Sequence, residues 1–572
     1  MIINGLGVSA GIAIGRAYVI KKQQAFMTGT LLVNDADVLA EIEKFNNAVT
    51  ASVSEIEAII NNYDPANGYE GLDILEAHIE LISDPQIKDD VTEKINIDKK
   101  NANDALIEVI ANAVELFKSM DDEYMAGRAA DVQDIGNRLL KNLNAKPATN
   151  QTEYAAGTII IAEDLSPSDT ITMDISKIAG FATQVGGATS HAAIIAKSRG
   201  IPAVLGCGDA VNDIKHDSLL ILDGQNGLIL VEPDEATIDR YKARQVEWLK
   251  KASLLNAIKN TTATTTDGTI IHLVANIANA ADMTAALEFG AEGAGLLRTE
   301  LLFMGRDYFP TEDEQFEFYK AVALQAKDKP VTARTLDIGG DKNLPYFNLP
   351  AEQNPFLGYR AIRISLDRTD VFITQLKAIL RASVFGNLRI MFPMIANIQE
   401  IRAAKEVLNQ AKTALTADNI AFKDVKVGIM IEIPSAAITA DLLAKEVDFF
   451  SIGTNDLCQY TLAVDRMNEK IGTLYDPYNP GVLRLIQYVI EQGYKHNIEV
   501  GMCGELASDP KATLLLMGMG LTEFSMNAVS IPQIKNIIIN SDKSAAKQIH
   551  QTVMQMDSSA DIRAYLQEID KW

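Results

Sequence analysis

The segment Val427–Ile452, VGIMIEIPSAAITADLLAKEVDFFSI, decides the fold of the C-terminal half of this chain. It begins with an apolar run, Val427–Ile433, and ends in a second apolar run, Asp448–Ile452, with an alanine-rich stretch between them. Short apolar runs joined by a longer connection are typical of buried parallel strands linked by helices. If such a unit recurs, it predicts an α/β fold.

The unit does recur through the C-terminal half. Further strand candidates are Ile270–Ala275, Gly293–Leu297, Val331–Leu336, Leu388–Pro393, Glu499–Cys503 and Glu523–Met526. Eight strand–helix units in about 280 residues are typical of a (β/α)₈ barrel, whose functional residues lie at the carboxyl ends of the strands. We therefore expect the functional residues of this half to follow its strands directly.

Arginines and carboxylates lie on or directly after most of these strand candidates, near their carboxyl ends. The strand-end residues are Arg298-Thr299-Glu300, Arg334, Glu432, Asn455-Asp456 and Cys503-Gly504-Glu505. Arginine matches phosphate and carboxylate oxygens, and carboxylates are ligands for Mg²⁺. Any one of these residues alone is more often part of a structural ion pair. Their shared position favours a site that holds a small anion together with a divalent cation.

The three cysteines have different surroundings. Cys503 lies between glycines in Gly501–Glu505, which leaves little reason for it to pack, and a thiol beside an enolate can donate a proton to carbon. Cys207 and Cys458 have no comparable neighbours, and we interpret both as small buried hydrophobes. The scattered cysteines predict neither a disulfide framework nor a CxxC metal pair.

The N-terminal half contains two kinds of sequence pattern, one helical and one of short strands. After a first strand candidate, Gly11–Ile20, apolar residues recur at three- and four-residue steps, which predicts a helical bundle over 22–145. Short strand candidates then follow a polar linker at 146–156; they are Gly157–Ile161, Ile178–Ala182, Ala203–Leu205, Leu219–Leu222 and Leu228–Val231. We expect an α/β domain (1–21 and 146–233), the inserted bundle (22–145), a connecting helix (234–260) and the barrel (261–572).

A glycine-rich hexapeptide, Gly186-Gly187-Ala188-Thr189-Ser190-His191, precedes the apolar run Ala192–Ala196. Unpaired N–H groups at a helix N-terminus favour a phosphate. An imidazole placed there can accept a phosphoryl group, which Thr189 and Ser190 would stabilise. The hexapeptide by itself fits equally a loop whose histidine merely caps a helix.

Composition excludes several classes of function. The chain has 572 residues, 47% of them hydrophobic, and a net charge of −24, so nucleic acid is not an expected partner whereas a basic protein is. No apolar run approaches the roughly 18 residues of a membrane span, and the first residues lack a basic leader. We expect a cytoplasmic protein without membrane insertion.

Long blocks of this sequence resemble one family, enzyme I of the bacterial sugar phosphotransferase system, the phosphoenolpyruvate–protein phosphotransferases. The resemblance covers nearly the whole chain, and the most specific blocks are Gly186–His191 with Gly200–Ala203, Gly293–Pro310, Arg334–Leu344, Asn354–Arg363, Ser451–Arg466 and Gly501–Pro510. It implies a phosphohistidine domain that swivels, an inserted helical bundle and a C-terminal (β/α)₈ barrel.

The resemblance also implies roles for individual residues. His191 would be phosphorylated on Nε2, with Thr170 supporting the phosphohistidine. Glu432 and Asp456 would bind Mg²⁺, and Cys503 would donate a proton to the enolate of pyruvate. Residues implied to bind phosphoenolpyruvate or to balance its charge are Arg298, Arg334, Asn455, Asp456, Arg466, Lys342 and Arg360.

Two further expectations concern partners. The bundle would dock the histidine phosphocarrier protein (HPr) through the acidic and apolar helix that contains Glu76, His78 and Glu80, although an ordinary solvated helix face fits the same pattern. The barrel would form a Mg²⁺-dependent homodimer. One position departs from the family, because Lys197 stands where an arginine is usual; lysine keeps the charge but lacks the planar guanidinium.

Two alternative functions remain. A pyruvate, phosphate dikinase or phosphoenolpyruvate synthase shares the swivelling histidine domain and the barrel, but it needs a large ATP-binding domain for which the bundle leaves no room. A phosphoenolpyruvate sensor without turnover would have no need of His191, Glu432, Asp456 and Cys503 together.

Overall fold

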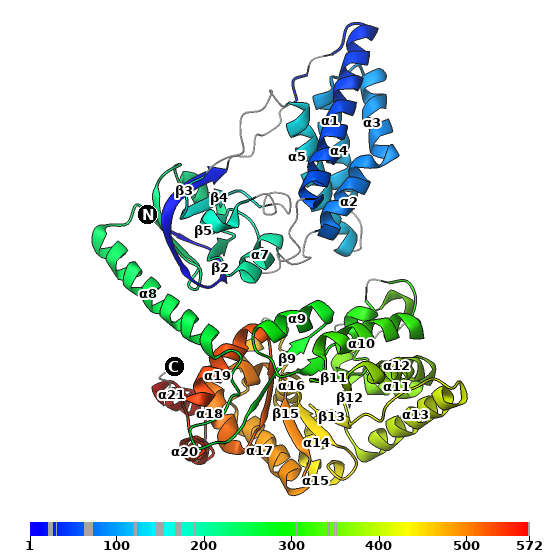
Figure 1. Ribbon diagram of the computed structural model, residues 1–572, viewed down its shortest axis with the longest axis vertical. Helices are drawn as coiled ribbons and strands as arrows, with labels where there is room; N and C mark the ends of the chain where they lie inside the picture. Colours follow the sequence, from blue (N-terminus) through cyan, green and yellow to red (C-terminus); the bar gives the residue numbers. More distant parts are fainter. Residues whose placement is uncertain are drawn as a thin grey trace. The chain divides into compact units, whose positions relative to one another are not determined.

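The computed structural model describes residues 1–20, 27–29, 31–61, 72–118, 123–144, 154–165, 173–187, 190–304, 306–339, 344–347, 349, 352–468 and 470–569. It divides into two compact units, Met1–Lys251 and Ala252–Trp572 (Figure 1). A mixed α/β fold with a closed barrel confirms the predicted fold class. Among the described helices, none combines the length and apolarity needed to cross a membrane.

Five helices of the first unit form a bundle, because their apolar residues recur at helical spacing and meet in one core. Fully buried members of that core include Phe45, Ile56, Leu75 and Leu106. The helices are α1 (Asp35–Asn61), α2 (Leu72–Ser83), α3 (Pro85–Asn96), α4 (Ala102–Lys118) and α5 (Glu123–Leu143).

An eight-stranded sheet is the second main component of the first unit. Its order is β1-β8-β7-β3-β4-β5-β6-β2. The strands are β1 (Ile2–Asn4), β2 (Leu6–Ser9), β3 (Ile12–Ile20), β4 (Thr158–Ala162), β5 (Ile178–Thr183), β6 (Ala203–Leu205), β7 (Leu219–Asp223) and β8 (Leu228–Val231). β3 and β4 pair in parallel, with Ala17 opposite Ile159, although the five helices separate them along the chain. The bundle is therefore an insertion in the connection between two neighbouring strands.

Helix α7 (His191–Arg199) follows β5 and has defined caps at both ends. Ser190 is its N-cap, and the Ser190 Oγ accepts the Ala193 N–H at 3.4 Å and donates to Gly187 O at 2.9 Å. Gly200 ends the helix at φ 63°, a left-handed conformation that glycine adopts without a Cβ clash. The predicted helix start at His191 is confirmed.

Helix α8 (Glu235–Ile258) contains the boundary between the two units. Its first half packs on the sheet: Tyr241 is buried with Ile12 and Ile221, and Gln245 Nε2 donates to Ile12 O at 2.7 Å. Near its far end, the buried Lys535 Nζ donates to Lys259 O at 2.5 Å. The first half of the helix is thus attached to the sheet, and the residue after its end is attached to the second unit.

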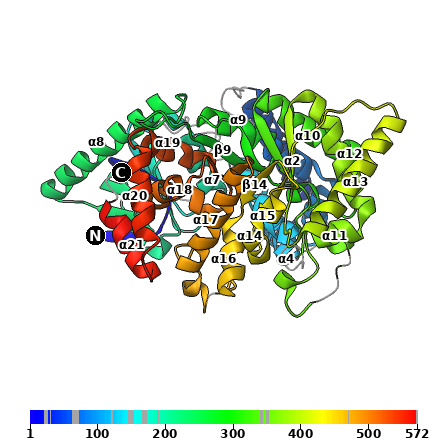
Figure 2. The same ribbon diagram turned by 90° about the horizontal axis from the view of Figure 1, so that it is seen from below.

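The second unit is a closed barrel of eight parallel strands surrounded by helices (Figures 1 and 2). Its strands are β9 (His272–Ile277), β10 (Ala294–Leu297), β11 (Pro330–Arg334), β12 (Asn387–Phe392), β13 (Val427–Ile431), β14 (Phe449–Ile452), β15 (Glu499–Met502) and β16 (Glu523–Met526). Its helices are α9 (Ala280–Glu288), α10 (Glu312–Ala326), α11 (Ile362–Asp367), α12 (Thr369–Ala382), α13 (Ile398–Ala417), α14 (Pro434–Ile438), α15 (Ala440–Leu443), α16 (Thr454–Leu462), α17 (Pro480–Lys495), α18 (Pro510–Met519), α19 (Ile531–Ile539), α20 (Lys543–Val553) and α21 (Ser559–Ile569). All eight predicted barrel strands are present, with ends that differ by up to two residues.

Candidate active site at the carboxyl ends of the barrel strands

Five of the predicted site residues stand at or just after the carboxyl ends of barrel strands. Arg334 is the last residue of β11, while Arg298, Glu432 and Cys503 directly follow β10, β13 and β15. Asp456 lies in the first turn of α16, after β14. In a parallel barrel these ends share one rim, where active sites of this fold lie.

A row of alternating charges crosses this rim. Arg334 contacts Glu300, and its Nη1 lies 3.2 Å from Asp337 Oδ2. Asp337 Oδ1 in turn lies 3.1 Å from Arg360 Nη2, which is 3.6 Å from Asp456 Oδ2. The row ends at Arg466, whose Nη2 is 3.9 Å from Asp456 Oδ1. The guanidinium groups of the rim are therefore held by carboxylates from different strands.

Both central arginines are buried, Arg334 at 7% and Arg360 at 3% exposure. Burial lowers the pKa of Arg334, but the charges of Glu300 and Asp337 outweigh it and raise the pKa overall. The pKa of Arg360 is likewise raised, by Asp337 and Asp456 against burial. The Nε atoms of both arginines are buried without a hydrogen-bond partner among the described residues. Both arginines therefore stay charged although they are buried.

Glu432 carries a buried carboxylate that lacks full compensation. Its Oε1 accepts the Met394 N–H at 2.6 Å, and burial together with the charges of Asp456 and Asp337 raises its pKa to about 8. A neighbouring cation would remove this penalty on the charged form. Glu432 and Asp456 are therefore the carboxylates of the rim best suited to share a divalent ion.

The donor set fits Mg²⁺ in one specific way. Within the described residues, no three His, Cys, Asp or Glu side chains are grouped so that they could hold a metal ion by themselves. Mg²⁺ is usually held by one or two carboxylates, with substrate oxygens and water completing its six ligands. Glu432 and Asp456 match that pattern, in which the metal binds together with a substrate.

Cys503 corrects one sequence-based expectation. The prediction that its flanking glycines leave it unpacked was wrong: Cys503 is 6% exposed and packs in an apolar cluster with Leu296, Met391, Met430 and Phe449. The neighbours come from other strands, so the adjacent glycines have no bearing on them. Burial raises the pKa of the Cys503 thiol to about 11. The side chain therefore carries a proton at neutral pH.

Asn455 is oriented by Glu505. From sequence, Glu505 was predicted to lie at the rim but was given no role. The Asn455 Nδ2 donates to Glu505 Oε1 at 3.1 Å, and the Glu505 N–H donates to Asn455 Oδ1 at 2.9 Å. This reciprocal pair ties the start of α16 to the residues after Cys503. Arg298 and Arg466 are the exposed arginines of the rim.

Two contributors to the rim were missed from sequence. Asp337, which bridges two arginines, stands three residues after Arg334. The Tyr460 hydroxyl accepts from Arg360 Nη1 at 3.1 Å and donates to Phe356 O at 2.5 Å. Tyr460 lies one helical turn after Asp456, so both face the same guanidinium. The i,i+4 spacing on α16 is the signal that could have identified it.

Other predicted residues are only partly described. Thr170, Thr189 and Lys342 lie outside the described residues, and so does the side chain of His191, whose backbone begins α7. Lys197 is exposed in the last turn of that helix.

The predicted partner contacts on α2 differ in their burial. Glu80 is exposed, and the side chain of Glu76 lies outside the description. His78 is 1% exposed, with Nδ1 3.9 Å from Asp134 Oδ2 of α5. Its placement on a partner-binding surface was therefore wrong, because the ring is packed inside the bundle.

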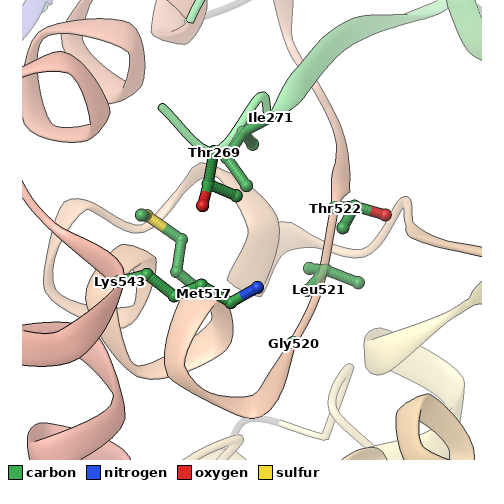
Figure 3. Close-up of a pocket in the computed structure, with 7 residues that line it drawn as sticks. All are labelled: Thr269, Ile271, Met517, Gly520, Leu521, Thr522 and Lys543. Carbon is green, nitrogen blue, oxygen red and sulfur yellow. The ribbon is translucent and has the colours of Figure 1, made fainter. Parts of the chain in front are cut away.

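A small cavity lies at the opposite ends of the strands (Figure 3). Its volume is about 240 Å³, open solvent included, and it is lined by Thr269, Ile271, Met517, Gly520, Leu521, Thr522 and Lys543. Ile271 and Thr522 directly precede β9 and β16, so the cavity is at the amino ends. It is separate from the rim described above.

Comparison with known proteins gives consistent matches along the chain. Family models described as PEP-utilising enzyme match at residues 4–128 (N-terminal), 154–227 (mobile domain) and 252–543 (PEP-binding domain). The phosphoenolpyruvate-protein phosphotransferase of Priestia megaterium is 45% identical, over 98% of this chain and 97% of its own. That of Bacillus subtilis is 44% identical over 100% of both chains. A solution structure titled Enzyme I is 37% identical over 43% of this chain and 99% of its own, with a TM-score of 0.38.

Proposed function

The chain belongs to the family of phosphoenolpyruvate-protein phosphotransferases, and from this premise we propose its complete reaction. The phosphoryl group of phosphoenolpyruvate passes to His191 of this chain and from there to the histidine phosphocarrier protein HPr, with release of pyruvate. This is the first step of the sugar phosphotransferase system. The observation that carries the proposal is the row of paired arginines and carboxylates at the rim, next to a protonated thiol.

The rim suits a substrate that carries both a phosphate and a carboxylate. We propose that Arg298, Arg334 and Arg466 bind these groups, that Asn455 adds a hydrogen bond and that Arg360 balances charge. Buried guanidinium groups keep their charge and need no reorganisation when an anion arrives. Lys342 is proposed as a further compensating charge from its sequence block alone.

A divalent cation belongs to the same proposal. The row sets three arginines against three carboxylates, Glu300, Asp337 and Asp456, so a multiply charged anion brings an excess of negative charge. Mg²⁺ held by Glu432 and Asp456 would supply positive charge to the substrate oxygens. The raised pKa of Glu432 supports this assignment, because burial and the charges of Asp456 and Asp337 outweigh those of Arg334 and Arg360.

The chemistry requires one phosphoryl transfer and one proton transfer. As the imidazole nitrogen of His191 forms a bond to phosphorus, the bond from phosphorus to the enol oxygen breaks. The resulting enolate takes a proton at carbon from the Cys503 thiol, and the thiolate recovers its proton from water. Cys503 can act in this way because burial keeps it protonated at neutral pH.

His191 belongs to the first compact unit and the rim to the second, and the proposal includes movement of one unit relative to the other. We propose the α/β domain (1–21 and 146–233) as the carrier, with hinges at the connecting helix (234–260) and at 146–156, of which 146–153 lie outside the described residues. Thr170, Thr189 and Ser190 would support the phosphohistidine, and Ser190 already caps its helix.

The remaining parts of the chain complete the proposal. The bundle (22–145) would dock HPr, with Glu80 on its exposed surface. The barrel (261–572) would bind phosphoenolpyruvate and form a homodimer. The proposal includes a cytoplasmic location.

A pyruvate-release assay tests this function. The full-length protein with phosphoenolpyruvate and Mg²⁺ should release about one pyruvate per chain, and continuous release should require HPr. His191→Ala should abolish both the release of the first pyruvate and the continuous release with HPr, while leaving phosphoenolpyruvate binding intact. Phosphoenolpyruvate binding without any pyruvate would support a sensor instead. Labelling of His191 by ATP would support a dikinase-like enzyme.

A further inference from the structure

The inference concerns the point where β10 and β11 stop pairing. Their register runs from Ala294 opposite Val331 to Leu297 opposite Ala333, after which β10 turns into a short 3₁₀ helix, Glu300–Leu302. Beyond it, the Thr335 N–H still bonds to Met391 O of β12 at 3.0 Å. In a parallel sheet, the backbone N–H and C=O groups of alternate residues bond to the strands on opposite sides. Because residue 335 bonds to β12, the backbone groups of residues 334 and 336 face the side that β10 has left.

A glutamine from outside the barrel satisfies these backbone groups. Gln375 of α12 is 1% exposed, and its Oε1 accepts the Leu336 N–H at 3.0 Å. Its Nε2 donates to Thr299 Oγ1 at 3.3 Å, and Thr299 Oγ1 donates to Arg334 O at 2.9 Å. The glutamine and threonine side chains thus replace the sheet hydrogen bonds that β10 no longer makes.

A primary amide is the side chain that this position requires. Gln375 uses its acceptor on Leu336 and its two donors on Thr299 and on the Tyr319 hydroxyl, 3.0 Å away. Glutamate has no donor for the two hydroxyls, and methionine offers neither function. A buried backbone N–H left without a partner is costly, so the strand end would shift to find another one.

The two residues held in this way lie between members of the rim. Thr299 stands between Arg298 and Glu300, and Leu336 stands between Arg334–Thr335 and Asp337. We propose that Gln375 is a positioning residue, which sets the arrangement of Arg298 and Arg334 and thereby the affinity for phosphoenolpyruvate. It reaches them through Thr299 and Leu336. The inference rests on the proposed function in that these arginines bind the substrate.

Gln375→Met in the full-length protein tests the inference. We expect kcat/KM for phosphoenolpyruvate to fall about ten- to a hundred-fold, as for other residues that orient a binding group. Most of the change should appear as a higher KM and as a matching rise in the Kd of phosphoenolpyruvate measured by calorimetry. Thr299→Val should have the same effect, whereas Thr299→Ser, which keeps the hydroxyl, should restore most of the affinity.

Gln315→Met is the matched control. Gln315 of α10 is also 1% exposed, its Nε2 donates to Pro310 O at 3.0 Å, and within the described residues its side chain bonds to neither strand end. This variant should keep the KM of the wild type. An unchanged KM and Kd in Gln375→Met, or an equal loss in Gln315→Met, would overturn the inference.

The outcomes also separate this inference from the proposed function. If the wild type binds phosphoenolpyruvate but releases no pyruvate, the proposed function fails, and the Kd values still decide the role of Gln375. If Gln375→Met does not fold, the Thr299→Val and Thr299→Ser pair decides it, because equal Kd values in the two would contradict the inference.

Discussion

At the scale of single residues, the environment of Cys503 determines its chemistry. The apolar cluster around it raises the pKa of the thiol to about 11, so the group is an acid at neutral pH, not a nucleophile. A buried, protonated thiol at the carboxyl end of β15 is suited to protonate an enolate carbon and unsuited to attack phosphorus.

Cys503→Ala should therefore slow pyruvate formation without weakening phosphoenolpyruvate binding. Loss of a general acid costs about a hundred-fold or more in rate. Single-turnover measurement of pyruvate formation, with the Kd of phosphoenolpyruvate measured in parallel, shows whether the rate falls while binding is unchanged. In the wild type, a thiolate-selective reagent at pH 7 should leave Cys503 unmodified. Rapid modification at that pH, or full turnover in the alanine variant, would remove Cys503 from the proposed mechanism.

Residue identity and residue environment were not equally predictable. Arg334, Glu432, Asp456 and Cys503 could be found from sequence because each lies near the carboxyl end of an apolar run that predicts a strand. Asp337 could not, since its role depends on a guanidinium 23 positions further along the chain. Packing around Cys503 was predicted wrongly for the same reason.

At the scale of elements, α10 shows how a local signal secures a segment next to the rim. Thr311 and Glu314 form a reciprocal capping box, and Arg306 Nη1 lies 2.8 Å from Glu314 Oε1. The backbone N–H of Thr311 and the charge of Arg306 lower the pKa of Glu314 to about 2. The cap therefore depends on an ionised Glu314.

Thr311→Ala should reduce stability by about 1 kcal/mol, the usual cost of a lost N-cap. Glu314→Gln should also destabilise the protein at pH 7. Since the folded pKa of Glu314 is below its ordinary value of 4.5, the stabilisation is present above pH 4.5 and is lost as the pH falls towards 2. In urea denaturation, the difference in free energy of unfolding between wild type and Glu314→Gln should become smaller from pH 7 to pH 3. A difference that stays constant would contradict this.

Strand prediction depended on length and periodicity. The barrel strands are apolar runs, so they were found, whereas β1 (Ile2–Asn4) and β2 (Leu6–Ser9) were missed. Across these two strands Asn4, Gly5 and Gly7 interrupt the apolar residues, and the partner strands β8 and β6 lie about 200 residues away. Such strands are specified by the sheet that they complete.

At the scale of the whole molecule, His191, the proposed phosphoryl acceptor, and the rim, the proposed substrate site, belong to different compact units. The transfer from phosphoenolpyruvate to His191 and the transfer between His191 and HPr should therefore be separable by mutation. Arg334→Ala should lower phosphoryl transfer from phosphoenolpyruvate about a hundred-fold or more, because it removes a preorganised charge at the rim. The same variant should still accept a phosphoryl group from phosphorylated HPr on His191, since that step does not use the barrel.

Mass-spectrometric location of the phosphoryl group tests the central claim most directly. The full-length wild type, mixed with Mg²⁺ and phosphoenolpyruvate and quenched at alkaline pH, should carry a phosphoryl group on His191. At the same short reaction time, Arg334→Ala should carry little phosphoryl group there from phosphoenolpyruvate but a full amount when phosphorylated HPr is the donor. A phosphoryl group on another residue of the wild type, or pyruvate released with no phosphorylated residue at all, would contradict the account.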